Sequence, residues 1–197
     1  MSPTVTKTAL EGVVILEPAV FPDHRGHFFE SFNLKDFEAA LSVRPVFVQD
    51  SQSCSVRNVV RGIHFQRKAP QAKLVRAISG EIFDVVVDVR SESPRFGAWI
   101  GVHLSAANRR QIWIPEGFGH GFVSMTPTAE VLYKVTRLWD PTDEWCLKWD
   151  DPDMGIEWPL SGPAIVSARD ASGMSLASLR AEGRHGPSEG SPNVQKG

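Results

Sequence analysis

The feature that most constrains the fold is a series of short β-forming segments with few helical patterns between them. In the segment EIFDVVVD, residues 81–88, Val85 and Val87 fall on one face while Asp84 and Asp88 fall on the other. This period of two predicts a half-buried strand. Further β-rich runs occur at residues 13–16, 46–48, 73–78, 99–104, 111–114 and 129–136. So many short strands, separated by turn-forming strings such as SPRFG and SAANR, predict an all-β sandwich or barrel, most simply a jelly roll.

One helix is expected beside the sheets. Asn33 can cap its N-terminus, and Asp36 follows three residues later, as in a capping box. Leu34, Phe37 and Leu41 share one face at helical spacing. We therefore expect the β-structure to carry only a few short helices at its periphery.

Length and composition predict a single domain. The chain has 197 residues, of which 42% are hydrophobic, which is enough for one sizeable core. We assign residues 1–181 to this domain. The remainder, residues 182–197, reads EGRHGPSEGSPNVQKG and has too few apolar side chains to offset the entropy lost on ordering. It is expected to be a flexible tail.

Charge and apolar runs exclude several classes of partner. The 21 Lys and Arg residues nearly balance 23 Asp and Glu residues, so no net field favours nucleic acid or an anionic membrane. No apolar run approaches the roughly 20 residues that span a bilayer. Glu11 and Glu17 flank and interrupt the N-terminal apolar run, unlike a secretory signal. Cys54 and Cys146 lack the spacing of a disulfide framework or zinc knuckle. We expect a cytoplasmic protein with reduced thiols.

His64 is the first candidate for chemistry, in the segment RGIHFQ. On a strand, Gly62, His64 and Gln66 would share one face, opposite Ile63 and Phe65. This places the imidazole on a polar lining, where it could act as a base. Because a lone histidine is more often structural, the pattern leaves both roles open.

Tyr133 and His120 are the next candidates. Tyr133 is the only tyrosine, and in AEVLYKVT it shares a face with Val131 and Val135, which points its hydroxyl into the barrel. It is either a proton carrier or a core residue bonded to backbone. His120 lies in PEGFGHGF, which we interpret as a glycine-rich loop that either approaches a ligand or simply turns.

A metal site and a phosphate site can be judged less directly. Metal-dependent jelly rolls usually carry a His-x-His pair, and this chain has none, so no metal is expected. Arg25, Arg61, Arg169 and Lys73 would suit a diphosphate if the fold brings them together, and otherwise form an ordinary solvated surface.

Several long strings, in order over about residues 8–172, strongly resemble the dTDP-4-dehydrorhamnose 3,5-epimerase family. They are FPDHRGHFFESFN (21–33), FVQD (47–50), VVRGIHFQ (59–66), KLVRAISGEIFDVVVDVR (73–90), SPRFGAWIGVHLSAANRRQIWIPEGFGHGF (93–122), AEVLYKVT (129–136) and WDDPDMGIEWP (149–159).

This resemblance implies a cupin-type jelly roll, a homodimer that exchanges strands, and epimerisation at C3 and C5 of dTDP-4-dehydro-6-deoxy-D-glucose without metal or other cofactor. It implies that His64 is the base, Tyr133 the acid, Asp170 the carboxylate that pairs with the histidine, and Lys73 the cation that stabilises the enolate. The positions that match nucleotide- and substrate-binding residues are Arg25, Glu30, Gln49, Asp50, Ser51, Arg61, His120, Trp139, Glu144 and Arg169.

These roles agree with the chemistry. The C3 and C5 protons flank a C4 ketone, so removal of either gives an enolate whose charge lies on one oxygen. Inversion needs reprotonation from the other face, and therefore two proton carriers. Ser51, Phe65 and Trp139 depart from the family pattern, and the change at Trp139 could restrict inversion to one centre. A single-centre epimerase is thus the nearest alternative, followed by a metal-dependent cupin and a non-catalytic sugar-nucleotide binder.

Overall fold

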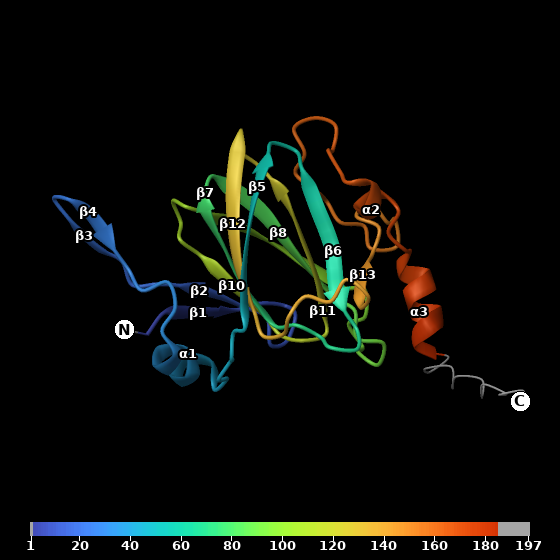
Figure 1. Cartoon of the computed structure of the whole chain (residues 1–197), viewed down its shortest axis with the longest axis horizontal. Coiled ribbons are helices and arrows are strands. Elements are labelled where there is room, and N and C mark those ends of the chain that lie inside the picture. Colours follow the sequence, from blue (N-terminus) through green and yellow to red (C-terminus); the bar gives the residue numbers. More distant parts are fainter. Residues whose placement is uncertain (1, 185–197) are drawn as a thin grey trace, which may run out of the picture.

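The computed structural model describes residues 2–184 and consists mainly of two antiparallel sheets packed face to face, which confirms the predicted cupin jelly roll (Figure 1). The six-stranded sheet has the order β1-β2-β10-β7-β12-β5. Its strands are β1 (Thr4–Lys7), β2 (Val14–Glu17), β5 (Gln49–Val56), β7 (Lys73–Ser79), β10 (Gln111–Ile114) and β12 (Thr128–Val135).

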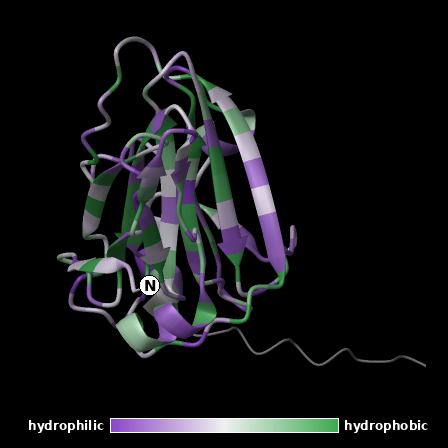
Figure 2. Cartoon of the chain, turned by 90° about the vertical axis from the view of Figure 1, so that its left-hand side faces the viewer, coloured by the Kyte–Doolittle hydropathy of each residue, from purple (hydrophilic) through white to green (hydrophobic). Residues whose placement is uncertain are grey.

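The five-stranded sheet has the order β13-β6-β11-β8-β9. Its strands are β6 (Val60–Gln66), β8 (Glu81–Asp88), β9 (Trp99–Ser105), β11 (Phe118–Ser124) and β13 (Glu144–Cys146). Polar and apolar residues alternate along many strands, as Figure 2 shows. Val75, Val131, Ile82 and Val86 meet between the sheets and are essentially inaccessible to solvent. Burying each such side chain stabilises the fold by about 1.5–3 kcal/mol.

The alternation predicted for residues 81–88 is present in β8, but the strand is not half-buried. Val85 and Val87 pack in a second apolar cluster on the outer face of the sheet, with Leu147 and Leu179 from later in the chain. Asp84 lies on the opposite face, and its side chain is fully buried. The expectation failed because a polar residue on a strand face suggests solvent, whereas here the second sheet covers that face.

The glycine-rich segment around His120 is also not a loop. It forms β11, which pairs with β6 and β8 in the middle of the five-stranded sheet. The glycines allow close packing here. A Cβ atom at Gly121 would lie 2.6 Å from the Arg61 carbonyl oxygen, and one at Gly119 would lie 2.6 Å from an Ile63 methyl carbon.

Of two further local predictions, the helix is confirmed and one strand is not. Helix α1 (Leu34–Leu41) begins at the expected cap, where the Asn33 side chain accepts from the backbone N–H groups of residues 35 and 36, and Phe37 is buried. The predicted β-run at residues 46–48 is wrong, because β5 begins at Gln49 and Val46 is 71% exposed.

The C-terminal segment covers the outer face of the five-stranded sheet. It contains α2 (Ala168–Ala171) and α3 (Leu176–Arg184), and Leu176 and Leu179 of α3 pack onto this face. The predicted tail begins inside α3, since residues 182–184 are helical, and its remainder, residues 185–197, lies outside the described residues. None of the helices in the described range is long and apolar enough to cross a membrane.

A small hairpin projects from the body of the molecule (Figure 1). It consists of β3 (Phe21–Asp23) and β4 (Gly26–Phe28), which pair only with each other. Phe21 is 40% exposed and Phe28 is 67% exposed. Two exposed phenylalanines on a projecting ribbon form an apolar surface that is not buried within this chain.

Candidate active site

A cavity of about 400 Å³ between the two sheets holds most of the predicted site residues. Strands β5, β7 and β12 line it from the six-stranded sheet, and β6 and β11 line it from the five-stranded sheet. The predicted residues in its wall are Gln49, Ser51, Arg61, His64, Lys73, His120, Tyr133, Trp139, Glu144 and Arg169. A larger groove of about 1120 Å³ beside α1 contains none of them.

A bulge in β6 brings Arg61 and His64 to the same cavity. His120 of β11 pairs with His64, but Phe122, two residues on, pairs with Arg61, so β6 has one extra residue there. Simple alternation would have put residues 61 and 64 on opposite faces. Arg61 is held by its Nε–H, which donates to Ser55 Oγ at 3.0 Å.

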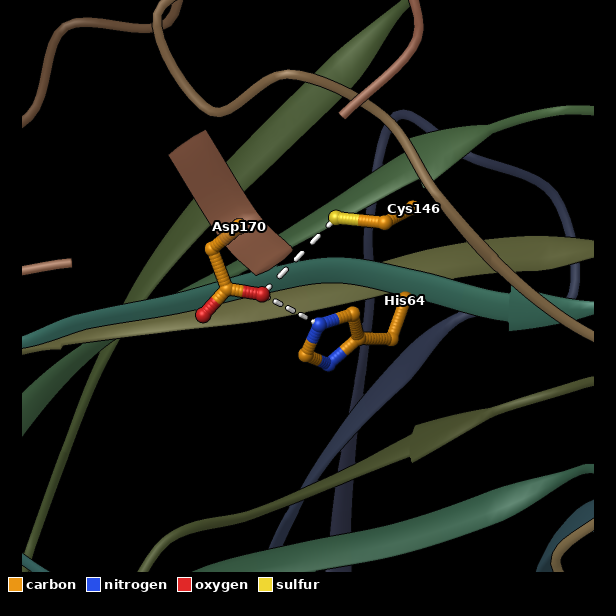
Figure 3. Close-up of side chains that lie close together, drawn as sticks. All are labelled: His64, Cys146 and Asp170. Atoms are coloured by element: carbon orange, nitrogen blue, oxygen red, sulfur yellow. Dashed lines mark hydrogen bonds and ion pairs between the residues drawn. The ribbon is translucent and has the colours of Figure 1, made fainter. Parts of the chain in front are cut away.

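His64 is hydrogen-bonded to Asp170 of α2 (Figure 3), with 2.6 Å between Nε2 and Oδ1. The Ser167 side chain caps α2 by accepting from the Asp170 N–H, which fixes the backbone that presents the carboxylate. Burial alone would raise the pKa of Asp170, but the hydrogen bond and charge interaction with His64 lower it below its ordinary value. An ionised Asp170 accepts a proton-bearing Nε2, which leaves the lone pair of His64 on Nδ1.

Glu144 lies on the other side of the imidazole. Its Oε1 is 4.0 Å from His64 Nδ1, while its Oε2 is 2.6 Å from Arg169 Nη1. The indole Nε1–H of Trp139 donates to the same Oε2 at 2.7 Å. Glu144 therefore connects a cation and an aromatic ring at the cavity wall to the neighbourhood of His64.

Lys73 is buried at the start of β7. Burial lowers its pKa to about 8, against the opposing influence of Glu144 and Asp84, which favour the charged form. A buried ammonium group at the cavity wall is a strong electrostatic partner for an oxyanion, because little water screens it.

Tyr133 lines the cavity from β12, in the sheet opposite His64. Burial raises the pKa of its phenol, the charge of Arg61 acts to lower it, and Glu144 adds to the rise. The phenol therefore keeps its proton at neutral pH and can donate it.

His120 forms a second histidine–carboxylate pair, with Asp84 of β8. His120 Nε2 lies 2.8 Å from Asp84 Oδ2, and both side chains are buried. Burial raises the pKa of Asp84, while the charges and hydrogen bond of His120 and the charge of Lys73 oppose the rise. Sequence reasoning missed Asp84, because the strand pattern assigned it to a polar face and no motif marked it.

The structure does not bring Arg25, Glu30 or Asp50 to the cavity. Arg25 lies in the turn of the β3–β4 hairpin and pairs with Asp23, and Glu30 accepts from the Asn33 side chain near α1. Gln49 and Ser51 of β5 line the cavity. Since side chains alternate along a strand, Asp50 between them faces away from the cavity.

Comparison with known proteins decides the family. A model of the dTDP-4-dehydrorhamnose 3,5-epimerase family matches residues 7–178. The chain belongs to this family. A dTDP-4-dehydrorhamnose 3,5-epimerase of Salmonella typhimurium is 55% identical over 168 residues, 85% of this chain and 92% of that protein. The dTDP-4-dehydrorhamnose 3-epimerase of Streptomyces niveus is 39% identical over 176 residues, 88% of this chain and 84% of that one.

A solved epimerase structure shows the same fold. The dTDP-6-deoxy-D-glucose-3,5-epimerase from Legionella pneumophila, in complex with dTDP-4-keto-L-rhamnose, superposes with a TM-score of 0.88 at 42% identity. The match covers 91% of this chain and 96% of that one. This chain and the Legionella epimerase thus share a cupin jelly roll, which in the Legionella structure holds a nucleotide sugar.

Proposed function

We propose that this protein inverts C3 and C5 of dTDP-4-dehydro-6-deoxy-D-glucose, giving dTDP-4-dehydro-L-rhamnose. The observation that carries the proposal is that His64 and Tyr133 line one cavity from opposite sheets, with Lys73 in the same wall. Epimerisation needs a base and an acid across one ring and a positive charge near the ketone oxygen. The cavity supplies all three.

In the proposed mechanism, Nδ1 of His64 removes the proton from C3 or C5. The electron pair moves to the C4 oxygen, and Lys73 stabilises the enolate charge. Tyr133 then donates a proton to the same carbon from the opposite face, which inverts the centre. Asp170 holds the imidazole in the tautomer that has its lone pair on Nδ1 and stabilises the imidazolium once it forms.

The polar wall of the cavity suits the rest of the substrate. Arg61 and Arg169 provide guanidinium groups for the diphosphate, and Trp139 offers a ring on which thymine can stack. Gln49 and Ser51 present amide and hydroxyl groups from β5, and the Gln49 Nε2–H donates to Ser51 Oγ at 3.0 Å. We assign these residues, with His120 and Glu144, to substrate binding.

We also propose a homodimer with exchanged strands, in which Arg25 and Glu30 serve the partner's cavity. The projecting hairpin with its exposed Phe21 and Phe28 supports this, as does the position of both residues outside their own cavity. Mixing Arg25→Ala subunits with His64→Ala subunits tests it. If the hairpin crosses, one site of the mixed dimer carries both native residues, and activity appears that neither variant has alone.

The activity is tested by NMR after incubation with dTDP-4-dehydro-6-deoxy-D-glucose in deuterated water. Deuterium at both C3 and C5, with conversion to the rhamno sugar, is the expected result. A non-catalytic binder would exchange neither position. Stoichiometric iron or manganese in the active protein would instead favour a metal-dependent cupin.

A single-centre epimerase is the second candidate, and Trp139 favours it. This residue departs from the family pattern and lines the cavity, where it can alter how the sugar turns between the two proton transfers. Phe65, the other aromatic departure, is buried in the outer cluster against Trp145 and does not line the cavity. Deuterium at only one carbon would establish the narrower activity.

We further propose that the protein works in the cytoplasm, with neither nucleic acid nor membrane as a partner. The near balance of basic and acidic residues supports the absence of these partners, because it leaves no net field that would hold nucleic acid or an anionic membrane.

A further inference from the structure

Cys146 has no part in the proposed reaction, yet it lies beside the His64–Asp170 pair. Its Sγ is 3.8 Å from Asp170 Oδ1, the same oxygen that His64 Nε2 approaches to 2.6 Å. Figure 3 shows the thiol and the imidazole converging on this carboxylate from two sides. One ligand atom from each residue lies within 4.8 Å of the other two. The three residues come from β6, β13 and α2, so no spacing in the sequence signals the cluster.

We propose that His64, Cys146 and Asp170 form a binding site for a thiophilic divalent cation such as Zn²⁺, and that the bound cation inhibits the enzyme. Thiolate, imidazole and carboxylate are the three ligand types that zinc takes in proteins, and Cys146 joins them by releasing its thiol proton to solvent as the cation binds. Binding is independent of the proposed function, whereas the inhibition rests on it, because it requires His64 to be the base.

The geometry is close to that of a tetrahedral site. With metal–ligand distances of about 2.0–2.3 Å, the ligand atoms of such a site lie roughly 3.3–3.8 Å apart. The sulfur and the carboxylate oxygen, at 3.8 Å, already meet this separation. The imidazole nitrogen and the carboxylate oxygen must move apart by somewhat less than about 1 Å, as a cation replaces the proton that they share.

The surroundings complete the site. The His64 side chain is 27% exposed and Cys146 is only partly buried, so a cation can reach the cluster and keep water as its fourth ligand. Glu144 Oε1 lies 4.0 Å from His64 Nδ1, on the side away from Asp170. A metal-bound histidine typically donates its other N–H to a carboxylate, and Glu144 is placed for that role.

The cation would inhibit by changing the tautomer of His64. In the proposed reaction Nε2 carries the proton held by Asp170, and Nδ1 has the lone pair that attacks the substrate. A cation on Nε2 forces the neutral ring to carry its proton on Nδ1. The lone pair needed to remove the C3 or C5 proton is then lost, although the substrate cavity itself stays open.

Cobalt titration of the full chain, stripped of metal and kept in a non-thiol reductant, tests binding directly. Co²⁺ should bind with a sulfur-to-metal charge-transfer absorption in the wild type and in Cys54→Ala, which removes the other, exposed cysteine. Cys146→Ala and Cys146→Ser should lack this band. Persistence of the band in both Cys146 variants, or no band in the wild type, overturns the site whatever the enzyme catalyses.

Zn²⁺ inhibition of epimerisation tests the consequence. Both Cys146 variants should need at least about tenfold more Zn²⁺ than the wild type or Cys54→Ala, since even loss of a supporting hydrogen bond weakens metal sites by that factor. Mg²⁺, which prefers oxygen ligands, should not inhibit at the same concentration. Equal Zn²⁺ sensitivity of the wild type and the Cys146 variants would overturn the inhibitory role. Failure of the proposed function would appear instead as no turnover in any sample, with the cobalt band intact.

Discussion

His64 and His120 lie opposite each other on the paired strands β6 and β11, line the same cavity, and are each hydrogen-bonded to a carboxylate. Their surroundings nevertheless differ. The His64 side chain is 27% exposed, and its Asp170 comes from the C-terminal segment, 106 residues away. The His120 side chain is 8% exposed, and its Asp84 comes from the adjacent strand and is fully buried.

The two carboxylates respond in opposite directions to these surroundings. For Asp170, hydrogen bonds and the charge of His64 outweigh burial and lower the pKa, whereas for Asp84 burial prevails and raises it. Asp170 is therefore suited to stabilise an imidazolium that forms during turnover. The comparison teaches that a histidine–carboxylate pair does not define a base: access to substrate and an ionised partner do.

Replacing the two histidines should separate their roles most strongly. His64→Ala should lower deuterium exchange at both C3 and C5 by about 10³-fold, because general-base catalysis contributes on the order of 10²–10⁴. His120→Asn should keep exchange within about tenfold of the wild type at saturating substrate and mainly raise KM, since we assign His120 to binding.

A third pair provides the control. His103 Nδ1 lies 2.7 Å from Glu81 Oε1 on the protein surface, and neither residue lines the cavity. His103→Ala should catalyse deuterium exchange at C3 and C5 of the substrate at the wild-type rate. Wild-type exchange in His64→Ala, or complete loss in His120→Asn with its fold intact, would reverse the assignment.

The carboxylates should differ next. Asp170→Asn retains an oxygen that accepts from Nε2 but loses the charge that stabilises the imidazolium, so kcat should fall by about 10²-fold with little change in KM. The decrease should be similar for exchange at C3 and C5, because both proton removals use His64. Glu81→Gln is the matched control at the surface pair. If Asp170→Asn kept full kcat, the carboxylate would only hold structure.

How much of this could be predicted from the sequence depends on whether the signal is local. The α1 cap at Asn33 and the bounds of β10 were predicted correctly because capping and β-forming composition act within a few residues. β11 was taken for a loop because glycine usually marks turns, whereas Gly119 and Gly121 make room for close packing. β5 reads QDSQSCSV and gave no apolar pattern, since it forms an edge of its sheet.

The candidate site followed the same rule. Strand alternation suggested His64 and Tyr133, the family resemblance gave these two and Lys73 their roles, and the structure brings all three to one cavity. Asp84 and Cys146 escaped notice, because the contacts that matter to them cross between strands and segments far apart in the chain. Only the fold could show that Asp84 lies next to His120 and that Cys146 lies next to His64, because no motif marks either residue.

A buried carboxylate and a surface carboxylate, each paired with a histidine, should differ in how much they contribute to the stability of the fold. Asp84→Ala removes one partner of a fully buried pair and leaves His120 uncompensated, which should lower the free energy of unfolding by about 3 kcal/mol. The same change at the surface, Glu81→Ala, should cost less than about 0.5 kcal/mol. Urea denaturation of both variants measures this. Equal midpoints would mean that burial of the Asp84–His120 pair contributes nothing to the fold.

Lys73 lines the same cavity as His64 and His120 and should produce the smallest effect, a dependence of activity on pH. Its pKa of about 8 results from burial, opposed by the charges of Glu144 and Asp84. Only the charged form can hold the enolate, so kcat/KM should fall about tenfold per pH unit above 8. Tyr133 cannot produce this decrease, because burial raises its pKa above the ordinary 10.0. Lys73→Arg, which stays charged, should abolish the decrease even if its overall rate is lower.

The same lysine should make activity and stability respond to pH in opposite directions. Below pH 8 the lysine is charged in both folded and unfolded chains, so the folded state carries the full cost of burying an ammonium group. Between about 8 and the ordinary pKa of 10.5 the unfolded chain binds more protons, and stability contributed by this group rises with pH. At about 1.4 kcal/mol per pKa unit, the cost at pH 7 is up to about 3 kcal/mol. Lys73→Met should therefore be inactive yet more stable than the wild type at pH 7, with an advantage that shrinks as pH rises through 8 and 9. Urea titrations at these pH values measure the difference, and an advantage that grew with pH would show that Lys73 is not buried in its charged form.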